Sequence, residues 1–240
     1  MSEGLVTTIR TALHVAADPV RGAAAQRYLK SKMPSLGVRV PEVRAIVRNA
    51  ARRLPPQSLS ELTAAVTGLW REARWREERL AAIELTGLRL ARDELAMLPL
   101  YEEIIRDGAW WDLVDSLAHR LGGLLLAHPG TMASLLRRWS QDPDLWIRRA
   151  SITAQLGAKG ATDRALLADV ITANLGDREF FIRKAIGWAL RDFSTTDPDW
   201  VRGFVDRAGD GLSPLSRREA LRKLGPAAPL EEGPQVTRLR

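Results

Sequence analysis

Two segments that match at an offset of 35 residues decide the fold: Trp146-Ile147-Arg148-Arg149-Ala150-Ser151 and Phe181-Ile182-Arg183-Lys184-Ala185-Ile186. A weaker copy, Leu215-Ser216-Arg217-Arg218-Glu219-Ala220, follows after a further 34 residues, and Trp75 and Trp111 occupy a similar phase upstream. A helix pair repeated at this spacing cannot bury its apolar face alone and must stack on its neighbours. The repeat therefore predicts a solenoid of stacked helix pairs.

Helical periodicity covers most of the chain, while runs of β-branched residues are short, so the predicted class is all-α. A period of about 35–40 residues with two helices per unit is typical of HEAT-like repeats, whose inner helices form a concave groove. We expect one domain over residues 1–224 and a disordered tail over 225–240, which has three prolines and little apolar material. The first two expected helices lie at about 3–16 and 20–33, a third opens at Val40-Pro41 and is ended by Pro55-Pro56, and Ser58-Leu59-Ser60-Glu61 fits a capping box for the next. Further helices are expected at about 73–91, 94–106, 110–127, 131–139, 144–157, 162–174, 179–193, 198–208 and 214–224.

The composition narrows the class of protein. A chain of 240 residues with 45 % hydrophobic content can bury a substantial core. It has no cysteine, and its three histidines, His14, His119 and His128, show no spacing typical of metal ligands, so we expect neither a metal nor a cofactor. Neither a signal peptide nor a membrane span is recognisable, and we expect a cytoplasmic protein.

The charge indicates the kind of partner. The formal net charge is +7, and arginine greatly outnumbers lysine among the 36 basic residues. Such a balance favours a polyanionic partner. The alternative explanation of this charge is a compositional bias, in which the high content of Ala, Leu and Arg reflects only a GC-rich genome.

The repeat also predicts a functional face. In the helix expected at 179–193, Lys184, Trp188 and Arg191 fall opposite the apolar stripe, and Arg149 takes the place of Lys184 one repeat earlier. Equivalent helices of a solenoid face the same way, so these four side chains should share its concave surface. Basic residues beside an indole suit phosphate and sugar. An ordinary solvated face is the alternative for Lys184 and Arg191.

A second cluster opens the helix expected at 110–127, with the sequence Trp110-Trp111-Asp112-Leu113-Val114-Asp115. Trp111 and Asp115 are four residues apart and lie together, away from the apolar stripe. We expect Trp110 in the core and Asp112 in a structural role, since a first-turn carboxylate is favoured by the helix dipole. Asp115 lies too deep in the helix for capping, although a solvated surface acid is an alternative, and an exposed Trp111 indicates an interaction surface.

Together these motifs resemble the AlkD-type DNA alkylation repair glycosylases, in order from about residue 20 to 224. The resemblance rests on Trp110–Asp115, Trp146–Ala150, Glu179–Arg191, Leu212–Ala220, and Tyr28-Leu29-Lys30 followed by Gly37 and Pro41-Glu42-Val43-Arg44. It implies a HEAT-like solenoid that wraps double-stranded DNA and excises positively charged N3- and N7-alkylated purines without pulling the base into a pocket. Such an enzyme is a monofunctional glycosylase that needs no cofactor, and we expect a monomer associated with the bacterial nucleoid.

The resemblance also implies roles for individual residues. Asp115 would be the catalytic carboxylate, and Trp111 and Trp188 would pack against the deoxyribose of the lesion. Arg149 would hold the DNA backbone, and the remaining expected DNA contacts are Tyr28, Arg44, Lys184 and Arg191. An alkylated purine is already a good leaving group, so a fixed negative charge and electron-rich ring faces suffice to stabilise the oxocarbenium-like sugar. Two alternatives are a non-enzymatic DNA-structure binder on the same scaffold and a HEAT-repeat scaffold for protein partners.

Overall fold

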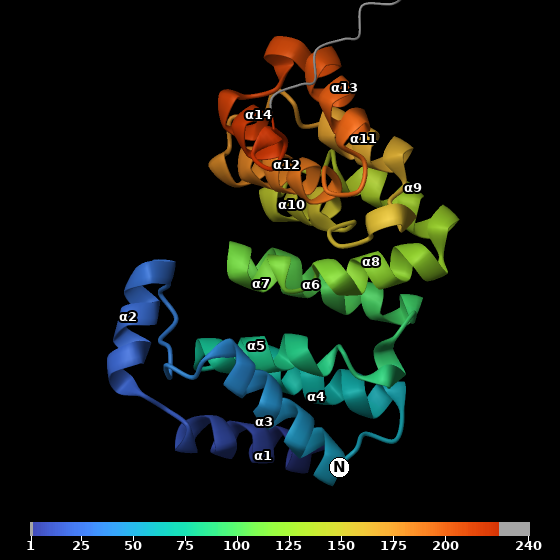
Figure 1. Cartoon of the computed structure of the whole chain (residues 1–240). Coiled ribbons are helices and arrows are strands. Elements are labelled where there is room, and N and C mark those ends of the chain that lie inside the picture. The colour runs from blue at the N-terminus through green and yellow to red at the C-terminus, as the bar shows by residue number, and fades with distance from the viewer. Residues whose placement is uncertain (1, 226–240) are drawn as a thin grey trace, which may run out of the picture.

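The computed structural model describes residues 2–225, which form fourteen α-helices and four short 3₁₀ helices and contain no strand (Figure 1). Apart from Gly225, the tail predicted to be disordered lies outside the described residues. The α-helices are α1 (Ser2–Val15), α2 (Pro19–Leu29), α3 (Val40–Arg53), α4 (Leu59–Arg71), α5 (Arg76–Leu85), α6 (Leu98–Gly108), α7 (Trp111–Asp115), α8 (Ala118–Ala127), α9 (Pro129–Trp139), α10 (Leu145–Thr153), α11 (Arg164–Thr172), α12 (Phe180–Phe193), α13 (Pro198–Ala208) and α14 (Pro214–Leu221). The 3₁₀ helices are η1 (Arg89–Ala91), η2 (Leu95–Met97), η3 (Lys159–Ala161) and η4 (Gly209–Gly211).

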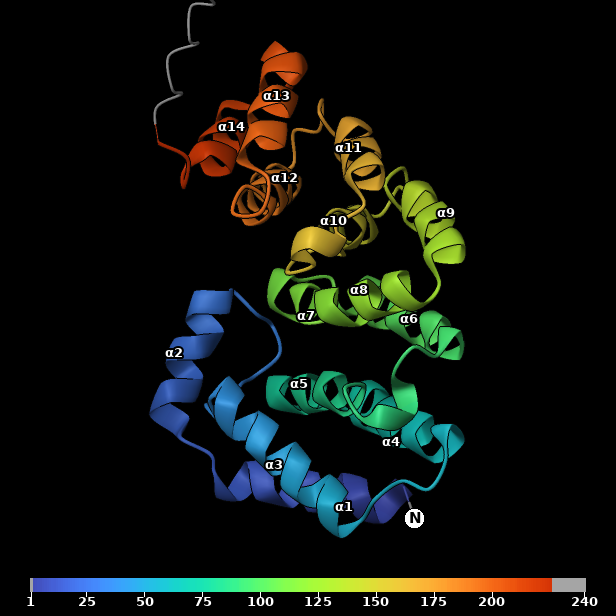
Figure 2. The same cartoon turned by 45° about the vertical axis from the view of Figure 1, so that its right-hand side comes forward.

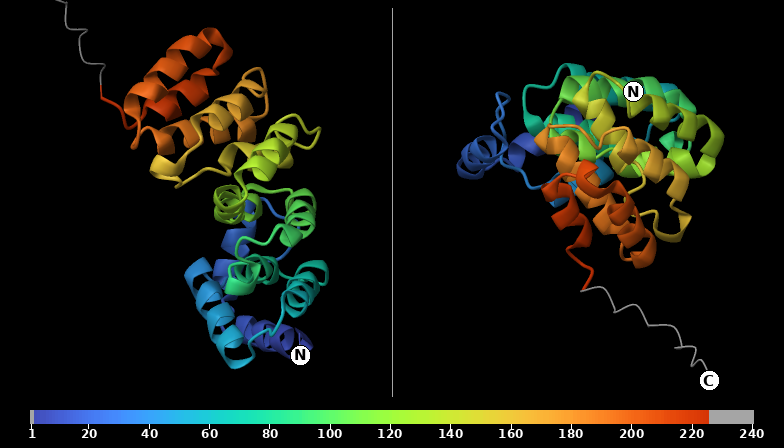
Figure 3. Two further views of the ribbon diagram at one scale, coloured as in Figure 1. Left: turned by 90° about the vertical axis from the view of Figure 1, so that its right-hand side faces the viewer. Right: turned by 90° about the horizontal axis from the view of Figure 1, so that it is seen from above.

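The helices stack in two layers that bend into an arc (Figure 2). Neighbour contacts join one layer, which consists of α3, α5, α7, α10, α12 and α14. A second layer packs against it and consists of α1, α4, α6, α9, α11 and α13. Figure 3 shows this stack from the side, with the N-terminal helices at one end and α13 and α14 at the other. The predicted all-α solenoid of helical repeats is therefore confirmed. None of the helices in residues 2–225 is long and apolar enough to cross a membrane.

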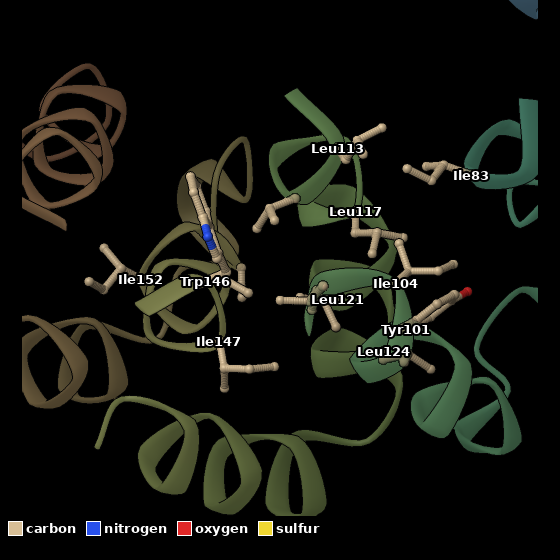
Figure 4. Close-up of a cluster of buried hydrophobic side chains, with 14 of the residues drawn as sticks. Ile83, Tyr101, Ile104, Leu113, Leu117, Leu121, Leu124, Trp146, Ile147 and Ile152 are labelled. Atoms are coloured by element: carbon tan, nitrogen blue, oxygen red, sulfur yellow. The ribbon is translucent and has the colours of Figure 1, made fainter. Parts of the chain in front are cut away.

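One continuous apolar core runs through the stack, from Leu5 in α1 to Ala220 in α14. Its middle section is formed where α6, α7, α8 and α10 meet, with Ile104, Leu117 and Leu121 fully buried between them (Figure 4). Burying each such side chain contributes about 1.5–3 kcal/mol. Since no pair of helices has this core to itself, each repeat depends on the next one for its burial.

Local signals set most helix boundaries as the sequence predicts. Pro41 lies in the first turn of α3, and the Ser58 hydroxyl accepts a hydrogen bond from the Glu61 N–H at the start of α4. The Glu61 carboxylate, however, accepts from the Gln57 N–H rather than from Ser58 itself, so the capping box expected there is only half formed. The second helix ends four residues earlier than expected, because Lys30 adopts a left-handed conformation with φ of 49°.

The single helix expected over 110–127 is wrong, because the chain forms two helices there. α7 ends at Asp115 and α8 begins at Ala118. Between them the Ser116 hydroxyl donates to the Asp112 carbonyl at 2.6 Å, and the Leu117 N–H bonds three residues back, to Val114. Leu117 stays fully buried through this tighter turn. Apolar periodicity alone could not reveal the break, since the buried positions continue across it.

Ion pairs link successive repeats at a nearly constant sequence separation. Arg76 pairs with Asp112 across 36 residues, Arg106 with Asp142 across 36, and Lys184 with Glu219 across 35. Because a repeat contacts only its neighbours, a cation in one repeat meets the carboxylate at the matching place in the next. These pairs therefore fix the register of the stack as well as adding charge-assisted hydrogen bonds.

Helix α2 stands apart from both layers, and of its own residues only Gly22 is buried. The loop that follows it is attached to α5 through the buried Glu77. This carboxylate accepts hydrogen bonds from the Ser35 hydroxyl at 2.6 Å and from the N–H groups of Leu36 and Gly37 at 2.8 and 2.9 Å. Gly37 has a φ of 81° and lies so close to α2 that a side chain there would overlap the Asp18 carbonyl. One buried acid thus attaches the loop after α2 to α5.

We predict that Gly187→Ala destabilises the protein by about 1–3 kcal/mol, the usual cost of overpacking. A Cβ at Gly187 in α12 would lie 2.5 Å from the Cβ of Glu219 and 3.1 Å from the Ser216 carbonyl oxygen in α14. Gly130→Ala is the control, because that helical position has nothing within 4 Å and should gain about 0.4–1 kcal/mol. Urea unfolding of the two variants measures both effects, and equal stabilities would contradict the close α12–α14 contact.

We predict that Glu77→Gln lowers the free energy of unfolding by about 1.5–3 kcal/mol, because it removes a charge that accepts three hydrogen bonds. Amide hydrogen exchange at Leu36 and Gly37 should also speed up, since both N–H groups donate to this carboxylate. The control Glu72→Gln changes an exposed acid at the carboxy-terminal end of α4. Its free energy of unfolding should stay within about 0.5 kcal/mol of the wild-type value. Unchanged protection at residues 36 and 37 would refute this role of Glu77.

Candidate functional site

A cavity of about 660 Å³ is lined by residues of α2, α7, α10, α12 and α14 and of the segments next to them. It brings together seven of the eight site residues predicted from the sequence, all except Arg44. Its lining consists of Tyr28, Lys30, Trp110, Trp111, Asp115, Arg149, Phe180, Phe181, Lys184, Trp188, Arg191 and Glu219. The layer that contains α7, α10, α12 and α14 thus carries the candidate site, together with the carboxy-terminal end of α2.

Asp115 and Arg149 form a two-pronged ion pair at the floor of the cavity. Arg149 Nε donates to Asp115 Oδ1 at 2.7 Å and Nη2 donates to Oδ2 at 2.8 Å. The third donor, Nη1, bonds the Phe181 carbonyl, so α7, α10 and α12 all meet at this guanidinium. The Arg149 residue is 5 % exposed and the Asp115 side chain 13 %. This pair fixes the direction of the carboxylate and leaves about two of its lone-pair sites unused by Arg149.

Burial raises the pKa of Asp115 above the ordinary aspartate value of 3.8, and the charge of Asp112 adds to the rise. The hydrogen bonds and the charge of Arg149 oppose it. Arg149 therefore favours the ionised form of this largely dehydrated carboxylate. The sequence indicated neither this partner nor the burial, although the two residues lie one repeat apart.

Aromatic rings line the same cavity as this pair. Trp111 lies partly buried on α7, and Tyr28 of α2 meets it edge to face, with 6.4 Å between ring centroids. Trp188 on α12 also lines the cavity. Tyr28 is 76 % exposed, so its ring lies open to a partner rather than in the core. Trp111 and Trp188 therefore present indoles beside a fixed carboxylate, as the sequence predicted.

A second group of aromatic rings is centred on Trp110. Trp110 packs against Trp146 and Phe181, with ring centroids 5.9 and 5.3 Å away. Edge contacts of this kind add about 0.5–1.5 kcal/mol to the burial of the rings. The expectation that Trp110 belongs to the core is therefore met in its packing, although its edge also reaches the cavity.

Lys184 and Arg191 share one carboxylate, that of Glu219 in α14. Lys184 Nζ lies 3.1 Å from Glu219 Oε1, and Arg191 Nη1 bonds Oε2. The hydrogen bond from Lys184 lowers the pKa of Glu219 against the opposing effect of burial, and the charges of Lys184, Arg191 and Arg222 lower it further. Sequence reasoning missed Glu219, although its separation of 35 residues from Lys184 equals one repeat.

The last predicted DNA contact, Arg44, lies outside the cavity. Its Nε donates to Glu84 at 2.9 Å across the face between α3 and α5. The carboxylate of Asp112 also points away from the cavity, into an ion pair with the buried Arg76. The structural role expected for Asp112 is thus met by a partner on the preceding repeat. Among residues 2–225, no three His, Cys, Asp or Glu side chains gather as a metal site.

Two comparisons with known proteins match the same kind of protein. A family model described as DNA alkylation repair enzyme matches residues 9–224. A solved structure from Enterococcus faecalis, titled a predicted DNA alkylation repair enzyme, superposes with a TM-score of 0.80 at 27 % sequence identity, and the match covers 88 % of this chain and 98 % of that one. No curated protein sequence matches the chain.

Proposed function

The chain belongs to the DNA alkylation repair enzyme family, and on that basis we propose that it is a DNA glycosylase that hydrolyses the N-glycosidic bond of N3- and N7-alkylated purines in duplex DNA. The observation that supports this most is the Asp115 carboxylate, which Arg149 holds in a cavity that the indoles of Trp111 and Trp188 also line. Lys184 and Arg191 on the same cavity wall supply positive charge for the DNA backbone.

The chemistry follows from the charge of the substrate. Alkylation at N3 or N7 leaves the purine positively charged, so it departs with the electron pair of the C1′–N bond and becomes neutral without a strong general acid. The sugar is left as an oxocarbenium-like cation. Asp115 offsets this developing charge, and each indole face adds about 0.5–2 kcal/mol of cation–π attraction. Water then adds to C1′ and gives up its proton to the carboxylate.

This proposal gives Arg149 a positioning role in addition to a backbone contact. Three of its five N–H donors are used on Asp115 and the Phe181 carbonyl. Two remain for a phosphate oxygen. We propose that excision proceeds without extruding the base into a pocket, as the resemblance to AlkD-type glycosylases implies.

The test of the proposed function is release of N3-methyladenine and N7-methylguanine from methylated duplex DNA. We expect the wild type to release base and Asp115→Asn to be about 10²–10³-fold slower while still binding the duplex, the loss typical of a transition-state charge contact. Trp111→Ala should be slower as well, since it removes one ring face.

Asp177→Asn is the matched control for Asp115→Asn. Asp177 forms the same kind of pair with Arg148, at 2.9 Å and with 14 % of its side chain exposed, but it lies outside the cavity. It should lower stability in a similar way and leave excision at the wild-type rate. A wild type that binds duplex DNA and releases nothing would overturn the glycosylase assignment and leave a DNA-structure binder.

We also predict the pH dependence of excision. The ionised form of Asp115 is the active one, so the rate should fall as the pH drops through a pKa above the ordinary aspartate value. Arg149→Gln should move this acid limb to still higher pH, because it removes the charge that opposes the effect of burial. Single-turnover rates measured from about pH 4 to about pH 8 record the shift, because this interval spans the titration of a carboxyl whose pKa is raised. An acid limb that stays in place in the variant would mean that a different group titrates.

A further inference from the structure

A second cavity, of about 340 Å³, adjoins the candidate site at Trp188 and Arg191. Both cavities are lined by Trp188 and Arg191, so these two residues form the partition between them. The other side chains of the second cavity are Asp192, Arg222 and Lys223. The two cavities are therefore neighbours, and of the two only the first is lined by Asp115.

The second cavity has an excess of positive charge. Three cations line it, Arg191, Arg222 and Lys223, against one carboxylate. That carboxylate, Asp192, already accepts the Gly157 N–H at 2.8 Å. Within residues 2–225, neither Arg222 nor Lys223 has a carboxylate within ion-pair distance, and both are exposed at the end of α14. Arg191 divides its guanidinium between this cavity and Glu219.

An indole and three cations around a small open cavity match one phosphodiester beside a stacked sugar. We propose that the second cavity binds the backbone phosphate next to the lesion nucleotide, with Arg191, Arg222 and Lys223 as its ligands. This inference rests on the proposed function. Trp188 would then stand between the reacting sugar and that phosphate, and the anchored phosphate would fix which nucleotide lies opposite Asp115.

The test compares two double variants with the same loss of charge. Arg222→Gln with Lys223→Gln removes two cations of the cavity, whereas Arg207→Gln with Arg218→Gln removes two exposed cations that line neither cavity. Binding to an unmodified duplex is measured over a range of salt concentrations. We expect the first variant to bind more weakly, with a log–log salt slope shallower by about 0.9 for one lost phosphate contact. The control should keep the wild-type slope, and equal slopes for the two variants would overturn the proposal.

A neutral backbone then locates the contact. Duplexes carrying a single methylphosphonate at successive positions around one N7-methylguanine remove one phosphate charge at a time. At one flanking position the wild type should lose affinity, while the Arg222→Gln/Lys223→Gln variant loses nothing further. Additive losses at every position would refute a single phosphate subsite.

Binding and base release report on the two proposals separately. A protein that passes both binding tests and releases no base keeps the subsite and loses the glycosylase assignment. A protein that releases base while the cavity variant behaves like the control keeps the glycosylase and loses the subsite. A wild type without affinity for duplex DNA would overturn both.

Discussion

The structure depends on one constraint, that no pair of helices can bury its apolar face without the pair that follows. The core therefore passes unbroken from α1 to α14, and residues 35 or so apart along the chain become neighbours in space. Polar side chains, like apolar ones, contact the residues about one repeat away in the sequence. Arg149 meets Asp115 across 34 residues, just as Lys184 meets Glu219 across 35. The candidate site is thus built from matching places on successive repeats.

This origin explains why so short an element as α7 carries the central carboxylate. With five residues it is too short to be stable alone. It is held from both sides, by Arg76 of the preceding repeat on Asp112 and by Arg149 of the following repeat on Asp115. The two acids lie on one small helix and point to opposite neighbours. The turn at Ser116 then frees α8 to follow the core, so the direction of Asp115 is set by its ion pair and not by a long helix.

The repeat made the fold predictable, because the matching segments at 146 and 181 report the period directly. The same register placed Arg149, Lys184, Trp188 and Arg191 on one face, and all four line the cavity. Arg44 was assigned from a motif alone, and it lies elsewhere, paired with Glu84. Glu219 and the pairing of Arg149 could not be read from the sequence. Both depend on how closely the helices approach, which at α12 and α14 is set by the missing side chain of Gly187.

The buried pair of Asp115 and Arg149 is better explained by chemistry than by stability. Removing two charges from water costs several kcal/mol per ion, and replacing such a pair with apolar side chains is often neutral or stabilising. Asp142 and Arg106 link their repeats equally well with 17 % and 38 % of their side chains exposed. The pair of Arg76 and Asp112 is about as buried as that of Arg149 and Asp115, with 7 % and 15 % of its side chains exposed, but it lines no part of the cavity, whereas Asp115 does. A carboxylate whose two oxygens are both bonded to Arg149, in a cavity also lined by two indoles, is held in place to act electrostatically on any positive charge that develops there. The energetic cost of the pair is consistent with a site whose substrate becomes cationic as it reacts.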